Sequence, residues 1–595
     1  MATPTNNFDL PKGSYISFDA TSLRQLILDR LNEQTTFTDQ NYVGSNLASI
    51  IDIISFSFNT LLFYLNKTST ESMFSESQIY ENINRIVKVL DYSPIGFQTS
   101  TLAFVASANT LSQGIYTIPR YSYVTANGAK YCFNQDVTFT KTLTAGIIEI
   151  VPELDNKKLL LQGSYQEYPL YNALGESGEV LVIDSTSNID HFNIDVYVNS
   201  VTTGEWVQYT KTSSLYLENS VAEKYEIRLN GSKQYEITFG NDINGRQLIA
   251  GDKVAIYYLQ SDGTAGEVGA LAFNGVSPQL FSSTQYDNII SNVINTNQVR
   301  LIASTETQYL KITNNSASTQ STLPETPDQI RSSAPASFRS QYRLVTESDY
   351  ENYIKTNYTN IISNVRVVNN TTYTTEYLQY FYNLGIVDPT LTDRALFNQI
   401  QYADACNFNN VYLIIIPNTS VNSLGAYVLP AQKELIQTSL VGVKGLTTEV
   451  SFVDPVYKSV AIGVKGATST LSVTDERLCQ LVITKTKTSI RDDIAIINDV
   501  VSIFTTYFSK QNLSLGQVLD INSISQQIIG VDGVDTFKTT RTDTGESIPG
   551  LSLFVWNPDY PSADGNMYTT NNTLRFFEYP YLYDWDNLSS KIVVA

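Results

Sequence analysis

The chain of 595 residues contains a single histidine, His191, and only three cysteines, Cys132, Cys406 and Cys479. The cysteines lie far apart without metal-site spacing, so neither a zinc site nor a disulfide framework is expected. Nucleophilic catalysis needs a base beside the nucleophile, and the turn-like sequence around His191 predicts a solvated surface residue instead. Because no P-loop motif is present either, we expect no enzyme activity, bound metal or cofactor.

Basic residues are also scarce, because 38 Lys and Arg stand against 58 Asp and Glu, giving a formal net charge of −20. Nucleic acids and anionic membranes bind clustered Lys and Arg, so neither is expected as a partner. The N-terminus does not resemble a signal peptide. The apolar stretch 47–65 contains Asp52 and Asn59, which favours a buried helix over membrane insertion.

Residues 1–95 have the pattern of a helical region. Between residues 47 and 65, apolar residues recur at spacings of three and four, which places them on one helix face, and a further helix is expected over 76–90. Further apolar residues fall outside that stripe, so the helix needs cover on more than one side. Other helices of this chain or a bundle shared with another subunit could supply the cover, and the sequence favours neither. The candidate bundle residues are Leu47, Ile51, Ile54, Phe56, Phe58, Leu61, Phe63, Tyr64 and Leu65.

Two β-rich domains are predicted next, over 96–223 and 224–326. Apolar and polar residues alternate on both sides of Asn230-Gly231, which predicts a hairpin with a positive φ angle at Gly231. Asn127-Gly128 predicts a second hairpin in the same way. The polar segment 314–326 is expected to be a linker or an extended loop.

An α/β domain is predicted over 327–545. Thr346 and Asp349 suit the start of a helix, because each side chain can accept a bond from the other's backbone amide. The order of patterns after this helix alternates between strand and helix. The expected elements are strands over 411–416 and 456–464 and helices over 429–440 and 473–487. The predicted fold class is multidomain α+β, with an N-terminal helical bundle segment, central β-rich domains and a C-terminal α/β domain.

Residues 546–595 form an aromatic C-terminal tail. Aromatic side chains are concentrated there among turn residues, a composition unlike that of an independent core. The tail either wraps back onto its own domain or docks on a partner, where aromatic anchors often dominate binding. The candidate docking residues are Trp556, Phe576, Phe577 and Trp585.

The glycine-punctuated run that follows Asn230-Gly231 resembles the signature of the baseplate J-like family, whose members build the tail baseplates of contractile phages and related injection machines. Residues 324–354 resemble the second hallmark of that family, and 116–133 and 514–537 are similar to further segments in the same order. The hallmark residues are Asn230, Gly231, Phe239, Gly240, Gly245, Arg246, Gly251, Arg343, Thr346, Asp349 and Tyr350.

Residues 44–96 are similar to the helical start of the large baseplate wedge protein of T-even-like phages. The resemblance implies a structural subunit of the virion's tail baseplate, synthesised and assembled in the host cytoplasm. It also implies a dimer within a twelve-copy ring around the central hub, with other wedge proteins and sheath-proximal baseplate proteins as partners. The implied role is to transmit the conformational change that triggers sheath contraction.

Two alternatives come from other classes. A tail fibre or host-binding adhesin would suit the abundance of Tyr, Ser, Thr and Asn, although such fibres are usually trimers with repeated β units and this chain shows no repeat. A tail enzyme such as a polysaccharide hydrolase is the third reading, because a pair of carboxylates close in space cannot be recognised from sequence.

Overall fold

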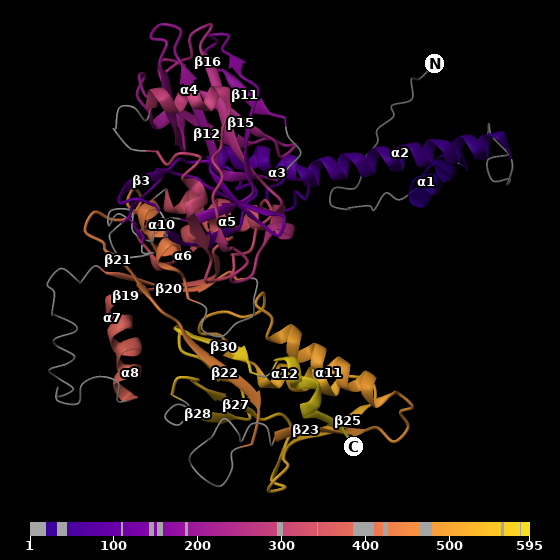
Figure 1. Ribbon diagram of the computed structural model, residues 1–595. Coiled ribbons are helices and arrows are strands. Elements are labelled where there is room, and N and C mark those ends of the chain that lie inside the picture. Colours follow the sequence, from indigo (N-terminus) through magenta and orange to yellow (C-terminus); the bar gives the residue numbers. More distant parts are fainter. Residues whose placement is uncertain are drawn as a thin grey trace, which may run out of the picture. The chain divides into compact units, whose positions relative to one another are not determined.

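The chain folds into two compact units, of which the first is helical in its described residues and the second contains both helices and strands (Figure 1). The first unit comprises Met1–Ser93 with Thr326–Arg331, and the second comprises Pro94–Glu325 with Ser332–Ala595. The mixed content confirms the predicted α+β fold class. The computed structural model describes residues 20–32, 45–108, 111–141, 148–150, 159–184, 188–293, 301–341, 343–384, 410–419, 427–464, 479–560, 565–583 and 585–595.

The first unit is built around one long helix, α2, along part of which α1 packs (Figure 1). The hydroxyl of Ser45 accepts a hydrogen bond from the Ala48 amide at 2.9 Å and so caps the start of α2. The helical elements of this unit are α1 (Ala20–Asn32), α2 (Asn46–Glu71), α3 (Tyr80–Val87) and the 3₁₀ turn η1 (Lys88–Leu90).

The second unit contains an eight-stranded sheet in which neighbouring strands are antiparallel, except for β13 and β14, which are parallel. Alternating side chains of β14 and β15 enter its core, as their sequence pattern predicts. The order of strands is β10 (Tyr171–Asn172), β16 (Lys253–Ser261), β12 (Asn188–Asn199), β13 (Trp206–Thr212), β14 (Lys224–Leu229), β15 (Tyr235–Phe239) and β11 (Val180–Ile183), and β9 (Ser164–Glu167) also pairs with β16.

The hairpin between β14 and β15 is present, but its turn differs from the prediction. The positive φ angle lies at Lys233, at 62°, and not at Gly231. The side-chain oxygen of Asn230 accepts bonds from the amides of Ser232 and Gln234, both at 2.9 Å. Asn230 therefore anchors a longer loop whose left-handed residue comes at its end, and the prediction for Gly231 is wrong.

The hairpin at Asn127-Gly128 is confirmed, since both residues have positive φ angles, 53° and 84°, between two directly paired strands. It belongs to one of three smaller sheets in this part of the chain. Their strand orders are β1 (Thr101–Ala103), β8 (Leu159–Gln162), β5 (Ala129–Phe133), β4 (Tyr123–Ala126); β17 (Asn274–Val276), β18 (Leu310–Thr313), β2 (Val105–Ala108); and β3 (Gly114–Ile118), β6 (Val137–Lys141), β7 (Ile148–Ile150).

The C-terminal sheets draw on segments far apart in the sequence. The predicted strands over 411–416 and 456–464 are present as β20 and β22. The strand orders are β19 (Ile362–Asn369), β20 (Val411–Pro417), β21 (Val450–Val453); β28 (Gly565–Tyr568), β27 (Leu553–Trp556), β22 (Val456–Ile462), β30 (Glu578–Leu582); β26 (Ser547–Pro549), β25 (Val534–Arg541), β23 (Cys479–Lys485), β31 (Ile592–Val594); and the pair β24 (Val518–Leu519) with β29 (Asn572–Thr573).

The helix predicted over 473–487 is wrong where the structure describes it, since β23 occupies most of that stretch. Cys479, Leu481 and Ile483 are buried while the residues between them are more exposed, a period of two that belongs to a strand. β23 lies between β25 and β31, so pairing with distant segments decides its conformation. Residues 473–478 lie outside the described residues.

Helices complete the second unit, and the one predicted over 429–440 is present as α10. The capping box of Thr346 and Asp349 is also present at the start of α6, with both reciprocal hydrogen bonds. The helical elements are α4 (Thr284–Val293), α6 (Glu347–Asn357), α7 (Asn370–Thr372), α8 (Gln379–Asn383), α10 (Pro430–Leu440), α11 (Asp493–Tyr507) and α12 (Ile521–Ile529), the 3₁₀ turns η3 (Leu215–Leu217), η4 (Gly263–Gly266), η6 (Thr307–Tyr309) and η10 (Trp585–Lys591), and the π-helical turn η7 (Tyr373–Leu378); α5 (Pro327–Ser340) begins in the first unit.

Candidate assembly surface

Large apolar side chains of α2 are exposed along most of the helix. Phe56 is 67% exposed, Phe63 60%, Tyr64 61% and Leu65 69%. These four residues belong to a set of apolar side chains that surrounds the helix rather than lining one face, as the sequence predicts. The other exposed members of the set are Ile50, Ile53, Ile54, Phe58 and Leu61. We call this set, together with Phe56, Phe63, Tyr64 and Leu65, the α2 surface.

The chain itself covers only the beginning of α2. Ala48, Ile51 and Ser55 are the buried residues of this helix in the part of the chain that the structure describes, and Leu47 is half-buried. Asp52 forms an ion pair with Arg24 of α1 beside them. The prediction that 47–65 is a buried helix is therefore wrong for this chain alone, because the cover ends after the first three turns.

The C-terminal end of α2 is joined firmly to α3. The Glu71 carboxylate accepts hydrogen bonds from the Ile79 amide at 3.1 Å and from the Asn82 amide group at 3.2 Å, which lowers its pKa, the Ile79 bond being the largest cause. The Ser77 hydroxyl also donates to it at 3.1 Å, and Arg331 donates to the Ser77 carbonyl. Glu71 thus caps the start of α3 with a side chain from the previous helix.

By length and composition α2 also qualifies as a membrane-crossing helix, and it is mostly exposed in the structure. Its N-terminal half carries Asp52, and Asn59 and Asn66 lie further along. Each polar group would need a partner inside a bilayer. The composition therefore suits a helix that is covered by protein better than one surrounded by lipid.

A short buried segment follows the helical unit directly. Residues 94–101, which we call the strap, are buried without exception. At Gly96 a side chain would have no room, because a Cβ there would lie 2.0 Å from the Tyr235 hydroxyl. The strap is the only covalent path from the helical residues that precede it to the sheets that follow.

One side of the strap is bound to a β-bulge in β12, where the pairing register shifts between residues 189 and 194. The Gly96 amide donates to Nδ1 of His191 at 3.1 Å, and the His191 amide donates to the Phe97 carbonyl at 2.8 Å. The Thr99 amide donates to the Asp190 carboxylate at 2.7 Å. Sequence reasoning placed His191 on the surface, which is wrong, because the bulge turns its side chain inward onto the strap.

The environment of His191 keeps its imidazole neutral. Burial lowers the pKa of His191 well below its usual value, and the nearby charge of Lys211 acts in the same direction. Nδ1 can accept the Gly96 bond only while it carries no proton. The Lys211 ammonium also donates to the His191 carbonyl at 3.2 Å.

The other side of the strap pairs with the segment predicted to be a polar linker. The amides of Gln98 and Thr322 donate to each other's carbonyls at 2.9 and 2.8 Å, and the Ile95 amide donates to the Glu325 carboxylate at 2.9 Å. Of the two expectations for residues 314–326, a linker or an extended loop, the extended loop is the one that fits. Its hydrogen bonds attach it to the strap.

A third group of bonds comes from Asn360, which precedes β19. Its side-chain amide donates to the Thr99 carbonyl at 2.7 Å, and its backbone amide donates to the Gln98 side chain at 3.1 Å. The strap thus connects to β12, to residues 319–325 and to the chain before β19. Nothing in the local sequence of the strap signals these contacts, because every partner is distant along the chain.

The first group of hallmark residues fixes backbone conformation around β15. A Cβ on Gly240 would lie 2.1 Å from the carbonyl carbon of Gly245, which itself has a φ angle of 77°. Gly251 has a φ angle of 94°, Phe239 is buried in β15 and Arg246 pairs with Glu223. These residues build the loop after β15 rather than a site that could bind a ligand.

The second group lies at the start of α6. Thr346 and Asp349 form the capping box, and Tyr350 is buried beneath it. Arg343 is exposed. The structure does not bring this group together with the first into one cluster.

The aromatic tail is largely integrated into the chain's own sheets. Trp556 is buried in β27, and Phe577 is buried in the C-terminal core, against which the half-buried Phe576 packs. β30 and β31, which come from this tail, pair in parallel with β22 and β23. Of the two arrangements that the composition leaves open, this is the one in which the tail wraps back. Trp585 is the first residue of η10.

In the described residues, no group of three or more His, Cys, Asp and Glu side chains is placed to hold a metal ion. Cys132 and Cys479 are buried and form no disulfide in the described residues, and burial raises the pKa of Cys132 to about 12. A thiol held in this way is a packing residue, because the thiolate is the reactive form. Cys406 lies outside the described residues.

No protein-family model and no curated protein sequence matches this chain. Among solved structures, a chain of the anti-feeding prophage baseplate is similar over 96% of this chain and 99% of that chain, with 11% identity and a TM-score of 0.29. A chain of the type VI secretion system TssK-TssF-TssG baseplate subcomplex is similar over 68% of this chain and 96% of that chain, with 6% identity and a TM-score of 0.27. TM-scores this low do not establish a shared fold, so the functional assignment rests on the chain's own residues.

Proposed function

We propose that this chain is a structural wedge subunit of a contractile-tail baseplate, located in the virion. The order of the baseplate J-like hallmark segments and the helical start similar to a large wedge protein support this role. The observation that carries it is the α2 surface, because exposed side chains of this size and number need a protein cover. The role requires no catalytic group, metal or cofactor.

The cover of α2 consists of helices from a second copy of the chain and from another wedge protein. Apolar residues all around α2 suit a bundle in which several helices contact it at once. A paired subunit is also what a twelve-copy ring of six wedges around a central hub requires. The α1 contact at the beginning of α2 leaves the remaining turns available for this bundle.

The strap transmits movement of the bundle to the rest of the subunit. A baseplate that triggers sheath contraction needs interfaces with two stable arrangements, linked by elements that do not stretch. The Glu71 cap joins α2 to α3, and three residues separate the end of η1 from the start of the strap. Displacing the strap would disturb β12, residues 319–325 and the chain before β19 together, because it bonds to all three.

Site-specific photo-crosslinking tests this function in cells that produce the complete tail. A photo-reactive phenylalanine analogue replaces Leu61 of α2, and crosslinked partners are identified by mass spectrometry. We expect a second copy of the chain and one other baseplate protein. The same analogue at Val221, an exposed apolar residue of the second unit, is the control and should give a different set of crosslinks.

Crosslinks from Leu61 to lipid alone would instead support membrane insertion of α2. Absence of the chain from purified tails, with free chain in the cytoplasm, would contradict the structural role altogether. A stable trimer of the chain on distal fibres would favour the adhesin alternative.

A further inference from the structure

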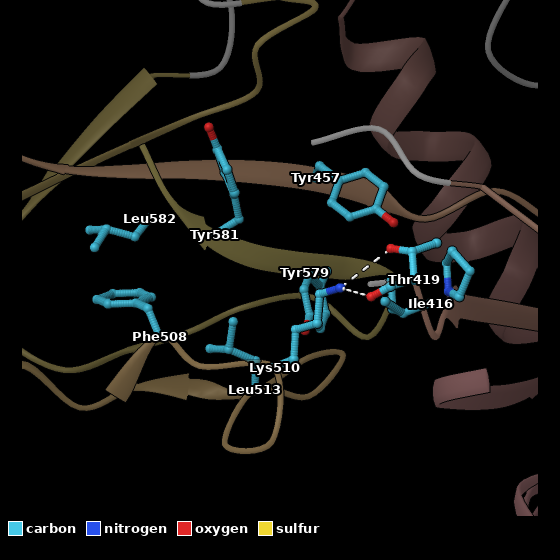
Figure 2. Close-up of a pocket in the computed structure, with 10 residues that line it drawn as sticks. Ile416, Thr419, Tyr457, Phe508, Lys510, Leu513, Tyr579, Tyr581 and Leu582 are labelled. Carbon is cyan, nitrogen blue, oxygen red and sulfur yellow. Dashed lines mark hydrogen bonds between the residues drawn. The ribbon is translucent and has the colours of Figure 1, made fainter. Parts of the chain in front are cut away.

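A cavity lies between the ends of β20 and β30 and the loop that follows α11, within the second unit (Figure 2). Its enclosed part is small, with about 30 Å³ of space for the centres of water-sized molecules, and it opens into about 410 Å³ of space that includes open solvent. Figure 2 shows the ammonium of Lys510 directed at Thr419, to whose carbonyl and hydroxyl oxygens it donates. The lining residues are Ile416, Pro417, Thr419, Tyr457, Phe508, Lys510, Leu513, Tyr579, Tyr581 and Leu582.

The walls of this cavity are aliphatic and aromatic, and its polar groups are few. Among the described residues that line it, Lys510 is the one that carries a charge. Burial lowers the pKa of Lys510, so the protein environment opposes the charge of this ammonium. A bound anion would offset that cost, because hydrogen bonds between charged groups strengthen where water is excluded.

Tyr579 provides the second observation. Its side chain is only 5% exposed, and its hydroxyl has no hydrogen-bond partner among the described residues. A buried hydroxyl without a partner is costly, and a ligand oxygen can remove the cost. Burial raises the pKa of Tyr579 to about 12, so the phenol stays protonated near neutral pH and can donate.

We propose that this cavity binds a carboxylate attached to a compact apolar group, with the Lys510 ammonium and the Tyr579 hydroxyl as donors to the carboxylate. The aliphatic and aromatic walls contact the apolar body. One ammonium and one phenol match the two oxygens of a carboxylate, whereas a phosphate would call for more donors and an arginine fork. A free monocarboxylic acid and the C-terminal carboxylate of a protein chain that ends in an apolar residue share this chemistry.

Binding is tested on the purified full-length chain, independently of any assembly. Saturation-transfer NMR and calorimetric titration measure binding of benzoate, of its neutral analogue benzamide, and of N-acetyl-Ala-Leu with a free carboxylate. We expect benzoate or the dipeptide to bind with a Kd of about 1 mM or lower. Benzamide should bind about ten- to a hundredfold more weakly, because it lacks the charge that Lys510 would contact.

Two variants assign the binding to this cavity. Lys510→Met should weaken carboxylate binding by about ten- to a hundredfold, and Tyr579→Phe by about three- to tenfold. Lys487→Met removes an exposed lysine instead and should leave binding unchanged. Tighter binding of benzoate identifies a free acid as the ligand, and tighter binding of the dipeptide identifies a chain terminus.

The proposal is overturned if neither carboxylate binds, if benzamide binds as well as benzoate, or if Lys510→Met binds like the unchanged chain. The comparison of benzoate with benzamide needs no substitution, so it decides the question even if a variant fails to fold. None of these outcomes bears on the baseplate role, which the crosslinking experiment tests separately.

Discussion

Two helices of this chain, α2 and α11, have similarly apolar sequences and opposite surroundings. α11 buries Ile496, Val500 and Phe504, spaced four residues apart, in the core formed with β23 and its neighbours. α2 buries only the residues of its first turns and leaves Phe56 and Phe63 in solvent. Apolar content therefore does not tell where a helix finds its cover. α11 thus stabilises the chain that carries it, whereas our proposal gives α2 the role of stabilising an assembly.

Truncating an aromatic residue in each helix should give the largest difference between them. Phe504→Ala should lower the free energy of unfolding of the C-terminal region by about 3–5 kcal/mol, because it leaves a cavity in a closed core. Phe58→Ala on α2 should change it by less than about 0.5 kcal/mol, since Phe58 is half exposed. Chemical denaturation of the isolated chain measures both. Equal losses would show that α2 is covered within its own chain.

Replacing exposed aromatic residues of α2 should have a large effect on incorporation into wedges, although it has little effect on the stability of the isolated chain. Phe63→Ser combined with Tyr64→Ser should weaken incorporation into wedges by more than about 30-fold, which corresponds to the loss of a binding hot spot of 2 kcal/mol or more. The melting temperature of the isolated chain should not change. Tyr216→Ser with Leu217→Ser, an exposed pair of the second unit, is the matched control. Normal wedges from the α2 variant would end the assembly interpretation of this helix.

The free energy of unfolding should depend on pH through the strap, because the strap bonds to the buried imidazole of His191. His191 is the only histidine of the chain, so no other imidazole contributes. Its folded-state pKa is lowered, so below pH ~6.5 the unfolded chain binds a proton that the folded chain does not. Stability should therefore fall by up to about 1.4 kcal/mol per pH unit as the pH decreases from there. His191→Gln keeps an acceptor for Gly96 and should remove this slope.

His191→Ala tests the same bond without titration. It leaves the Gly96 amide buried without an acceptor and should cost about 1–3 kcal/mol near neutral pH, a difference that shrinks below pH ~6.5 because there the unchanged chain itself loses stability. Hydrogen exchange of the strap amides, compared with that of α2 amides, localises the loss. A pH slope that persists in His191→Gln would assign the titration to carboxylates instead.

The sequence predicts those features whose cause is local. The turn at Asn127-Gly128 and the capping box of Thr346 and Asp349 depend on residues within four positions, and both are present. The inward position of His191 and the strand at 479–485 depend on pairing with distant segments. The sequence predicted a surface histidine and a helix there, and both predictions are wrong. The resemblance to a baseplate family directed attention to α2, but the extent of its exposure required the structure, because cover is a property of the whole chain.

The smallest effect is expected in the hairpin between β14 and β15. The sequence predicted this hairpin correctly but placed its positive φ angle at the wrong residue. Lys233 holds the left-handed conformation there, which costs a residue with a Cβ about 1 kcal/mol relative to glycine. Lys233→Gly should therefore raise stability by about 0.5–1 kcal/mol, whereas Gly231→Ala should change it by less than about 0.5 kcal/mol because φ is not positive at that position. Thermal unfolding of the two variants in parallel measures the difference. If Gly231→Ala instead lowered stability, Gly231 would have the positive φ angle that a two-residue turn requires. The longer loop anchored by the Asn230 side chain would then be contradicted.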